Sequence, residues 1–176
     1  MDGTKMEFII REALLEDAYK RAVCHVSSWR SAYKGIVPDE VLDNLSEEEI
    51  ADKFKKEIEQ KGYTFYCAEY EGKIIGHFNI RRSHDEDKPN AGEVHGIYLI
   101  EEFWGKGYGK KMMSCAIDSL KQMGYNEIIL WVLEENNRAR RFYEKCGFVF
   151  DGTKKEEIIG KPLIEIRYTI NLGIVK

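Results

Sequence analysis

Three glycines at alternate positions, Gly105, Gly107 and Gly109, separate an apolar run from a lysine-rich amphipathic segment in the stretch GIYLIEEFWGKGYGKKMM. Glycine lets the backbone turn sharply, so that successive N–H groups can point into one concavity. At the start of a helix, those donors and the helix dipole favour an anionic group, and Lys106 and Lys110 add positive charge nearby. The stretch therefore predicts either a phosphate-binding turn or a tight turn that needs small residues only for packing.

Two common nucleotide motifs do not fit this turn. A Walker loop requires Ser or Thr after its lysine, whereas Lys110 is followed by Lys111. A Rossmann fingerprint that began at Gly105 and Gly107 would require a third glycine at position 110, and it belongs directly after a first strand. The phosphate-binding interpretation that remains is a pyrophosphate turn for coenzyme A.

A second motif lies further along the chain, in LEENNRARRFYEKCGF. Asn136, Ala139, Tyr143, Gly147 and Phe148 match every position of the pattern NxxAxxxYxxxGF. Together with the glycine turn, this stretch resembles the GCN5-related N-acetyltransferase (GNAT) family, whose acetyl-CoA loop has the pattern (Q/R)xxGx(G/A). The resemblance implies an enzyme that moves an acetyl group from acetyl-CoA to a primary amine in one direct step.

Trp104 is where the chain departs from the loop pattern, because the family usually has Gln or Arg at this position. The resemblance implies that backbone N–H groups make most of the pyrophosphate contacts, so we predict that cofactor binding survives the change Trp104→Gln. Backbone groups of Ile97 and Leu99 are expected to hold the pantetheine arm, and Asn136 could also cap its helix. The cofactor-binding residues implied by the resemblance are Ile97, Tyr98, Leu99, Trp104, Gly105, Lys106, Gly107, Tyr108, Gly109, Lys110, Asn136 and Tyr143.

Acetyl transfer to an amine needs an acid for the leaving thiolate and a base for the ammonium group. The motif makes Tyr143 the expected acid, although a core tyrosine on an amphipathic helix would have the same spacing. A phenol, with a pKa of about 10, can protonate the thiolate if donation is coupled to C–S cleavage. Glu93 matches the place of the catalytic glutamate in the histone-type branch of the family, and His95 shares its strand face by the period of two. Glu93 is the preferred residue to act as the base or to position a water, His95 is the alternative, and many family members use only a chain of waters.

The acceptor side of the site is expected around SSWRSAYKGIVPDEVL, which resembles the acceptor-binding region of the family. Trp29, Tyr33 and His95 are the expected substrate-binding residues, although core packing accounts for the two aromatic rings as well. A small amine or polyamine is the favoured acceptor. The alternatives are a protein N-terminus or lysine as the acceptor, and a non-catalytic acyl-CoA sensor on the same fold.

The elements that must position these residues follow from hydrophobic periodicity. Strands are predicted over residues 7–13, 63–70, 73–82, 93–100, 127–133, 148–160 and 163–172. Helices are predicted over residues 14–33, 46–60 and 136–147, and one more runs from the glycine turn to Met123. This order predicts an α/β (α+β) fold whose mixed, mostly antiparallel central sheet has about seven strands flanked by about four helices. The resemblance implies the GNAT acyl-CoA N-acyltransferase fold over almost the whole chain.

Length and composition favour a single N-acetyltransferase domain over residues 1–176, since 43% of the residues are hydrophobic and no linker or repeat interrupts them. A net charge of −4 argues against a nucleic-acid partner. The four cysteines are far apart without a CxxC pair, so we expect reduced thiols and no metal site. With no signal peptide and no apolar run near the ~20 residues that span a bilayer, the expected location is cytoplasmic. The last strands of this fold often mediate dimers, so a homodimer is possible.

Overall fold

One seven-stranded sheet organises the protein, for which the computed structural model describes residues 7–173. The strand order is β1-β2-β3-β4-β5-β7-β6, and all neighbours are antiparallel except β4 and β5. The strands are β1 (Phe8–Glu12), β2 (Tyr63–Tyr70), β3 (Lys73–Arg82), β4 (Gly92–Leu99), β5 (Glu127–Leu133), β6 (Val149–Ile158) and β7 (Pro162–Asn171). The predicted mixed, mostly antiparallel sheet is confirmed.

Five α-helices accompany the sheet in the described part of the chain: α1 (Ala18–Ala32), α2 (Asp39–Asp43), α3 (Glu47–Ile58), α4 (Tyr108–Gln122) and α5 (Asn137–Lys145). Two 3-10 turns, η1 (Leu15–Asp17) and η2 (Glu101–Phe103), precede α1 and α4. The sequence predicts four helices, and α2 is the addition. Pro38 occupies its N-cap and two acidic residues fill its first turn, so the proline begins a helix where the periodicity predicts only a loop.

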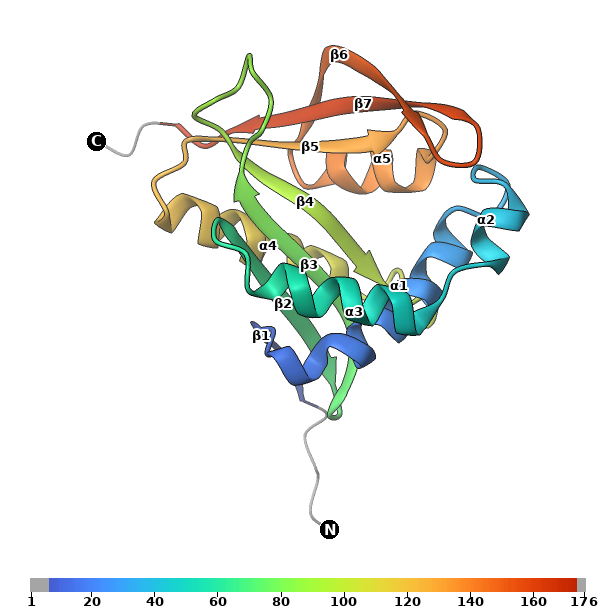
Figure 1. Cartoon of the computed structure of the whole chain (residues 1–176). Coiled ribbons are helices and arrows are strands. Elements are labelled where there is room, and N and C mark those ends of the chain that lie inside the picture. The colour runs from blue at the N-terminus through green and yellow to red at the C-terminus, as the bar shows by residue number, and fades with distance from the viewer. Residues whose placement is uncertain (1–6, 174–176) are drawn as a thin grey trace.

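The helices cover both faces of the sheet (Figure 1). On one face α1 packs against α3, where Ala18 and Ala22 meet Ala51 and Phe54. On the other face α4 and α5 bury their apolar stripes against the central strands, and Met112 is among the fully buried side chains. α1 and α4 thus pack against β3 and β4 from opposite faces, while Ala139 and Tyr143 of α5 belong to the same buried cluster as Val132 of β5 and Ile166 of β7.

The divergence of β4 from β5 opens the sheet at its centre (Figure 1). The two strands pair only at Gly92–Ile128 and Glu93–Ile129 and then separate. On its other side β4 stays paired with β3 as far as Leu99, apart from an irregularity at which His95 has no opposite residue. Beyond Glu93, the edge of β4 that faces β5 therefore has backbone groups without a strand partner, and these must find other acceptors and donors.

Two further sequence expectations concern the chain as a whole. Cys24, Cys67, Cys115 and Cys146 all carry free thiols, and the first two are buried. Among the helices of residues 7–173, none has the length and apolar character needed to cross a bilayer.

Candidate active site

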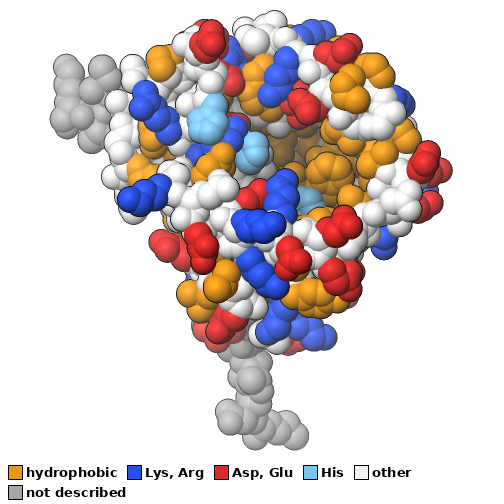
Figure 2. All heavy atoms as spheres, viewed as in Figure 1, with side chains coloured by type: hydrophobic (Ala, Val, Ile, Leu, Met, Phe, Trp, Pro, Cys, Tyr) orange, Lys and Arg blue, Asp and Glu red, His pale blue; other side chains and the backbone are white. Residues whose placement is uncertain are grey.

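A cavity of about 520 Å³ lies between the diverging strands β4 and β5 and the ends of α1, α4 and α5. Figure 2 shows the hollow, with a largely hydrophobic floor and charged side chains around its rim. Most of the residues predicted from the sequence contribute to its wall: Tyr33, Glu93, His95, Ile97, Tyr98, Leu99, Trp104, Gly105, Gly107, Gly109, Lys110, Asn136 and Tyr143. Trp29, Lys106 and Tyr108 do not line it.

The glycine turn forms the end of the cavity at which α4 begins. Gly105 and Gly107 have φ angles of 71° and 86°, in the left-handed region that favours glycine, and Gly107 is the N-cap of α4. A Cβ atom built on either residue would meet nothing within 4 Å. The turn is therefore open toward solvent, and the first N–H groups of α4 are available to an anion, which fits the pyrophosphate group of coenzyme A.

The side chains of Lys106 and Tyr108 point away from the cavity. The ring of Tyr108 packs against Phe8, with 4.7 Å between centroids, and against Phe103 at 5.8 Å. The ammonium of Lys106 lies 5.4 Å from the centroid of Phe103. These contacts pack the turn against β1 and η2, and the side chains of Lys106 and Tyr108 lie outside the cavity wall.

Trp104 joins the glycine turn to the end of β4. Its indole Nε1–H donates a hydrogen bond of 2.8 Å to the carbonyl of Leu99, one of the backbone groups expected to hold the pantetheine arm. The guanidinium carbon of Arg138 lies over the indole, 3.5 Å from the ring centroid. Arg138 lines the cavity but is not among the residues predicted from the sequence. The indication available in the sequence was that position 138 is a variable position within the second motif, NxxAxxxYxxxGF.

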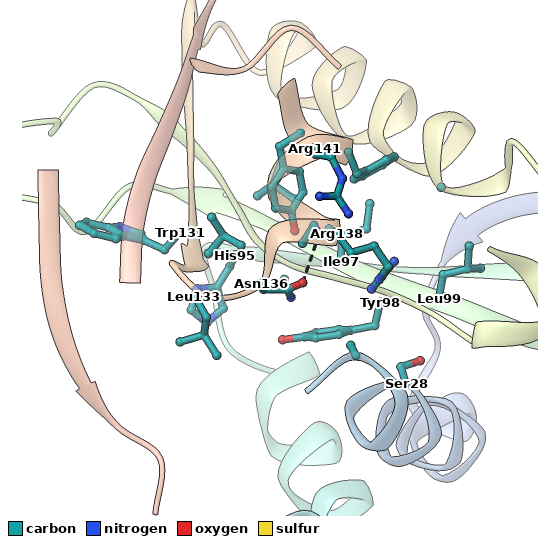
Figure 3. A pocket seen from close by; sticks show the side chains of 18 of the residues that line it. Ser28, His95, Ile97, Tyr98, Leu99, Trp131, Leu133, Asn136, Arg138 and Arg141 are labelled. Atoms are coloured by element: carbon teal, nitrogen blue, oxygen red, sulfur yellow. Dashed lines mark hydrogen bonds between the residues drawn. The ribbon is translucent and has the colours of Figure 1, made fainter. Parts of the chain in front are cut away.

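Asn136 and Tyr143 come from the two ends of α5. The side chain of Asn136 accepts a hydrogen bond of 3.2 Å from the N–H of Ala139, so the predicted N-cap is observed (Figure 3). The cap fixes the start of the helix, and two turns later Tyr143 points inward with 9% of its surface exposed. Burial raises the pKa of Tyr143 above its ordinary value of 10.0, so the phenol is protonated at neutral pH, as an acid must be.

Glu93 and His95 lie at the point where β4 and β5 separate. Glu93 is 3% exposed and accepts two hydrogen bonds from Arg81, of 2.7 and 3.2 Å. Burial by itself would raise the pKa of Glu93, but the hydrogen bonds from His95 and Arg81 outweigh it and lower the pKa below 4.5. His95 Nδ1 lies 3.3 Å from the same carboxylate. Because an ionised carboxylate only accepts, Nδ1 of a neutral His95 carries the proton and Nε2 is left as an acceptor.

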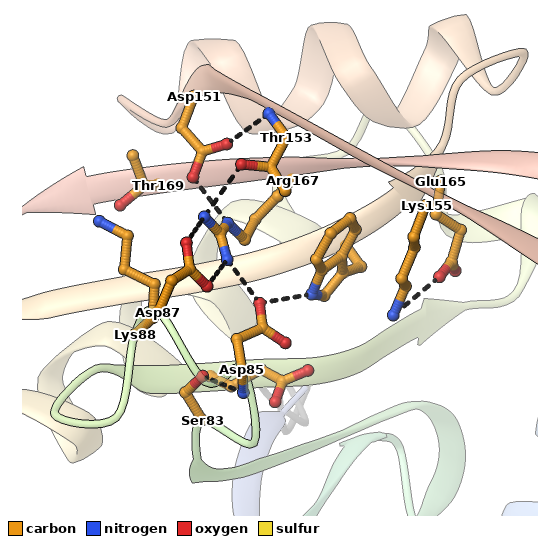
Figure 4. Close-up of polar contacts among 12 residues, drawn as sticks. Ser83, Asp85, Asp87, Lys88, Asp151, Thr153, Lys155, Glu165, Arg167 and Thr169 are labelled. Carbon is orange, nitrogen blue, oxygen red and sulfur yellow. Dashed lines mark hydrogen bonds and ion pairs between the residues drawn. The ribbon is translucent and has the colours of Figure 1, made fainter.

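The end of the cavity near β6 and β7 is bordered by a charged network that joins the loop after β3 to the two last strands (Figure 4). Arg167, whose side chain is 3% exposed, binds Asp85 at 2.8 Å, Asp87 at 2.6 Å and Asp151 at 2.6 Å. Asp85 also accepts a hydrogen bond of 3.1 Å from the indole of Trp131. Asp85 and Trp131 both line the cavity. The sequence did not predict this part of the site, because Asp85 and Arg167 are 82 positions apart.

Two aromatic residues at the C-terminal end of α1, Trp29 and the C-cap residue Tyr33, differ in their position relative to the cavity. Tyr33 lines the cavity, whereas Trp29 packs behind it with 4.8 Å between ring centroids. The indole of Trp29 also lies 6.4 Å from the ring of Tyr98 and belongs to a buried cluster with Val37 and Leu42. Trp29, predicted to bind the acceptor, therefore supports Tyr33 and Tyr98 from the core side.

Comparisons with known proteins identify the family and agree with the fold. The chain matches the Acetyltransferase (GNAT) family over residues 25–148. An uncharacterised N-acetyltransferase of Bacillus subtilis, YuaI, is 34% identical over 127 residues, which is 72% of this chain and 72% of that protein. A probable N-acetyltransferase of Mycobacterium tuberculosis is 28% identical over 145 residues, 81% of this chain and 80% of that one.

Solved structures show the same fold. The PaiA N-acetyltransferase of Thermoplasma acidophilum, in complex with coenzyme A, has a TM-score of 0.78 at 24% identity and covers 94% of this chain and 99% of its own. YncA of Salmonella typhimurium, described as a putative acetyltransferase with its cofactor acetyl-CoA, has a TM-score of 0.70 at 16% identity, with 97% and 96% covered.

The fold and the family match together define an acyl-CoA-dependent acetyltransferase. The chain belongs to the acetyltransferase (GNAT) family. The predicted fold, the predicted N-acetyltransferase class and acetyl-CoA as the cosubstrate are confirmed.

Proposed function

We propose that this enzyme acetylates a small amine or polyamine, with Tyr143 as the acid and His95 as the base. The observation that supports a cationic acceptor is the charge at the end of the cavity near β6 and β7, which we assign to the acceptor and call the acceptor end. There Arg81, Lys155 and Arg167 form ion pairs with more carboxylates than cations. The carboxylates bound to them are five: Glu93, Glu165, Asp85, Asp87 and Asp151. These eight groups carry an excess of two negative charges. Those that line the cavity, Asp85, Glu93 and Glu165 against Arg81 and Lys155, carry an excess of one, which attracts an ammonium group.

The size of the cavity supports a small acceptor. About 520 Å³ must hold the end of the pantetheine arm as well as the amine. Drug-sized ligands alone occupy sites of roughly 300–1,000 Å³. A slender chain such as a polyamine fits beside the arm, and its further ammonium groups can extend toward the carboxylates.

His95 is the better placed of the two candidate bases. Both oxygens of Glu93 are engaged by Arg81 and His95, and the carboxylate is 3% exposed. The side chain of His95 is 47% exposed and lines the cavity. We therefore assign Glu93, predicted as a catalytic residue, to positioning: it holds Nδ1 of His95 so that Nε2 can take a proton from the acceptor, directly or through a water.

The protons of the reaction balance with these two residues. His95 takes the first proton of the ammonium group and releases it to solvent, which leaves a neutral amine that attacks the thioester carbonyl carbon. As the C–S bond breaks, Tyr143 donates its hydroxyl proton to the sulfur. The second amine proton leaves the nitrogen as the amide forms, and it restores the proton that Tyr143 has lost.

A panel of acceptors tests the proposal. Release of free thiol from acetyl-CoA is measured with spermidine, putrescine, lysine, an aminoglycoside, glutamate and a basic peptide. We expect the highest kcat/KM for polyamines and a decrease of kcat/KM at high salt, because charge attraction between exposed groups is screened. A preference for the peptide would favour a protein lysine or N-terminus, and thiol release that no amine raises above background would favour the sensor.

The homodimer stays a prediction. The outer strand β6 carries exposed apolar residues, with Val149 62% and Ile158 65% exposed. Sedimentation of the protein and of a Val149→Lys/Ile158→Lys variant over a range of concentrations would show whether the protein dimerises and whether this edge is needed for it.

A further inference from the structure

Four basic side chains line the end of the cavity between α4 and α5: Arg138, Arg141, Lys110 and Lys145. Within residues 7–173, none of these four forms an ion pair, whereas the cavity-lining Arg81 and Lys155 each do. An end of a cavity with several unpaired cations suits a ligand that carries several negative charges. The question is which of the four has a fixed position and which group of the ligand it meets.

Arg138 is the one that packing holds in place. Its guanidinium carbon lies 3.5 Å from the centroid of the Trp104 ring, a contact that combines stacking with attraction between the cation and the ring. Trp104 is held in turn by its hydrogen bond of 2.8 Å to the Leu99 carbonyl. Figure 3 shows Arg138 extending from α5 toward β4. The guanidinium is therefore fixed beside the residue that directly precedes Gly105.

We propose that Arg138 binds the pyrophosphate of coenzyme A and that Trp104 is the platform that positions it. The turn at Gly105 and Gly107 offers backbone N–H groups to the pyrophosphate, and a guanidinium beside it can add two parallel hydrogen bonds to phosphate oxygens. The family pattern has Gln or Arg at position 104. In this chain an indole stands there, and the polar contact comes instead from α5.

The placement favours the pyrophosphate over the 3′-phosphate. Arg138 is in the first turn of α5 and touches the glycine turn through Trp104. Arg141 and Lys145 lie about one and two turns further along the helix, so they are the better placed for a phosphate outside the turn. Partial burial lowers the pKa of Arg138 from 12.5, and from that starting value the group stays charged at neutral pH.

Calorimetric titration with coenzyme A and with 3′-dephospho-coenzyme A tests the proposal on the unmodified chain and on Arg138→Met. We expect Kd to rise about tenfold or more for both ligands, as for the loss of one charge-assisted hydrogen-bonded pair. A rise of less than twofold would overturn the proposal. So would a loss confined to coenzyme A, because it would place Arg138 on the 3′-phosphate. The measurement needs no amine, so its outcome does not depend on which acceptor the enzyme uses.

Three further variants distinguish the loss of a direct contact between Arg138 and the pyrophosphate from a general loss of positive charge or of folded structure. Lys121→Met removes one exposed cation from the last turn of α4 and should change Kd less than twofold. The double variant Trp104→Arg/Arg138→Met returns an arginine to the family position, and we expect Kd within about threefold of the parent. If this double variant has an unchanged Tm but binds coenzyme A as weakly as Arg138→Met, an arginine at position 104 does not replace the contact of Arg138, and the proposal is contradicted. Trp104→Gln should bind within about threefold of the parent, since its amide restores the usual contact as the platform is lost.

Discussion

The two ends of the cavity use their cations differently. At the end between α4 and α5, Arg138 and its basic neighbours line the wall without carboxylate partners among the described residues. At the end near β6 and β7, Arg81 and Arg167 are each bound to carboxylates and almost buried. The first end has positive charge to offer a ligand. At the second end the cations are already neutralised, and the carboxylates are in excess.

We therefore expect the unpaired cations to bind a ligand and the paired cations to stabilise the wall of the cavity. An unpaired cation at a wet surface can be removed with little effect on folding, because its partner is the ligand. Removal of a buried cation that binds three carboxylates lowers the stability of the fold, since it leaves those charges uncompensated. The end near β6 and β7 is thus a wall with an excess of carboxylates, and the end between α4 and α5 offers positive charge to an anion.

The largest expected effect comes from Arg167→Met. It removes the single guanidinium that binds Asp85, Asp87 and Asp151. We expect the free energy of unfolding to fall by about 3 kcal/mol, the lower end for a broken buried pair, because the side chain of Asp87 is 61% exposed. Urea denaturation measures the loss. The matched variant Arg138→Met should lie within about 0.5 kcal/mol of the parent, and equal losses in the two variants would contradict the comparison.

Tyr143→Phe is expected to affect chemistry and not cofactor binding. The ring fills the same space beside Phe148 and Tyr168, and only the hydroxyl is lost. We expect kcat to fall about a hundredfold, the low end for loss of a general acid, and Kd for coenzyme A to stay within about twofold. Steady-state kinetics and calorimetry together give the two values. A variant as fast as the parent would refute the assignment of Tyr143 as the acid.

The glycine turn and the motif around Asn136 were predictable because each lies in one contiguous stretch. A left-handed turn needs glycine at Gly105 and Gly107, and a helix N-cap needs a side-chain acceptor such as Asn136. Such local requirements appear directly as residue types at fixed spacing. The sheet was predictable for a similar reason, since alternation and apolar runs mark its strands.

The remaining features depend on contacts between distant segments. Nothing in the spacing indicates that Arg138 lies on Trp104, or that Arg167 binds Asp85. Periodicity places Trp29 and Tyr33 on an apolar helix but does not distinguish a face toward the core from a face toward a cavity. The end near β6 and β7 is made largely of such contacts, so the residues predicted for the acceptor side include neither Asp85 nor Arg167.

His95→Gln tests how the acceptor end prepares the amine. We expect kcat/KM to fall about thirtyfold at pH 7. The loss is modest because a water molecule can partly replace the base. An alkylamine has a pKa of about 10, so the fraction of neutral acceptor grows as the pH rises and the base becomes less necessary. The ratio of parent to variant should therefore decrease between pH 7 and pH 9.5. A ratio that is constant across this range would show that His95 does not take the amine proton.

Glu165→Gln should give the smallest effect and the most specific one. Glu165 lines the cavity and pairs with Lys155 at 3.3 Å, and the two side chains are 20% and 44% exposed. Solvent screens so open a pair, so we expect only about a threefold loss of kcat/KM for spermidine and no change for a neutral acceptor such as hydroxylamine. Glu156→Gln is the matched control, because Glu156 is exposed on β6 and is not part of the cavity wall. An equal loss in both variants would mean that the charge of the whole protein, and not the acceptor end of the cavity, attracts the polyamine.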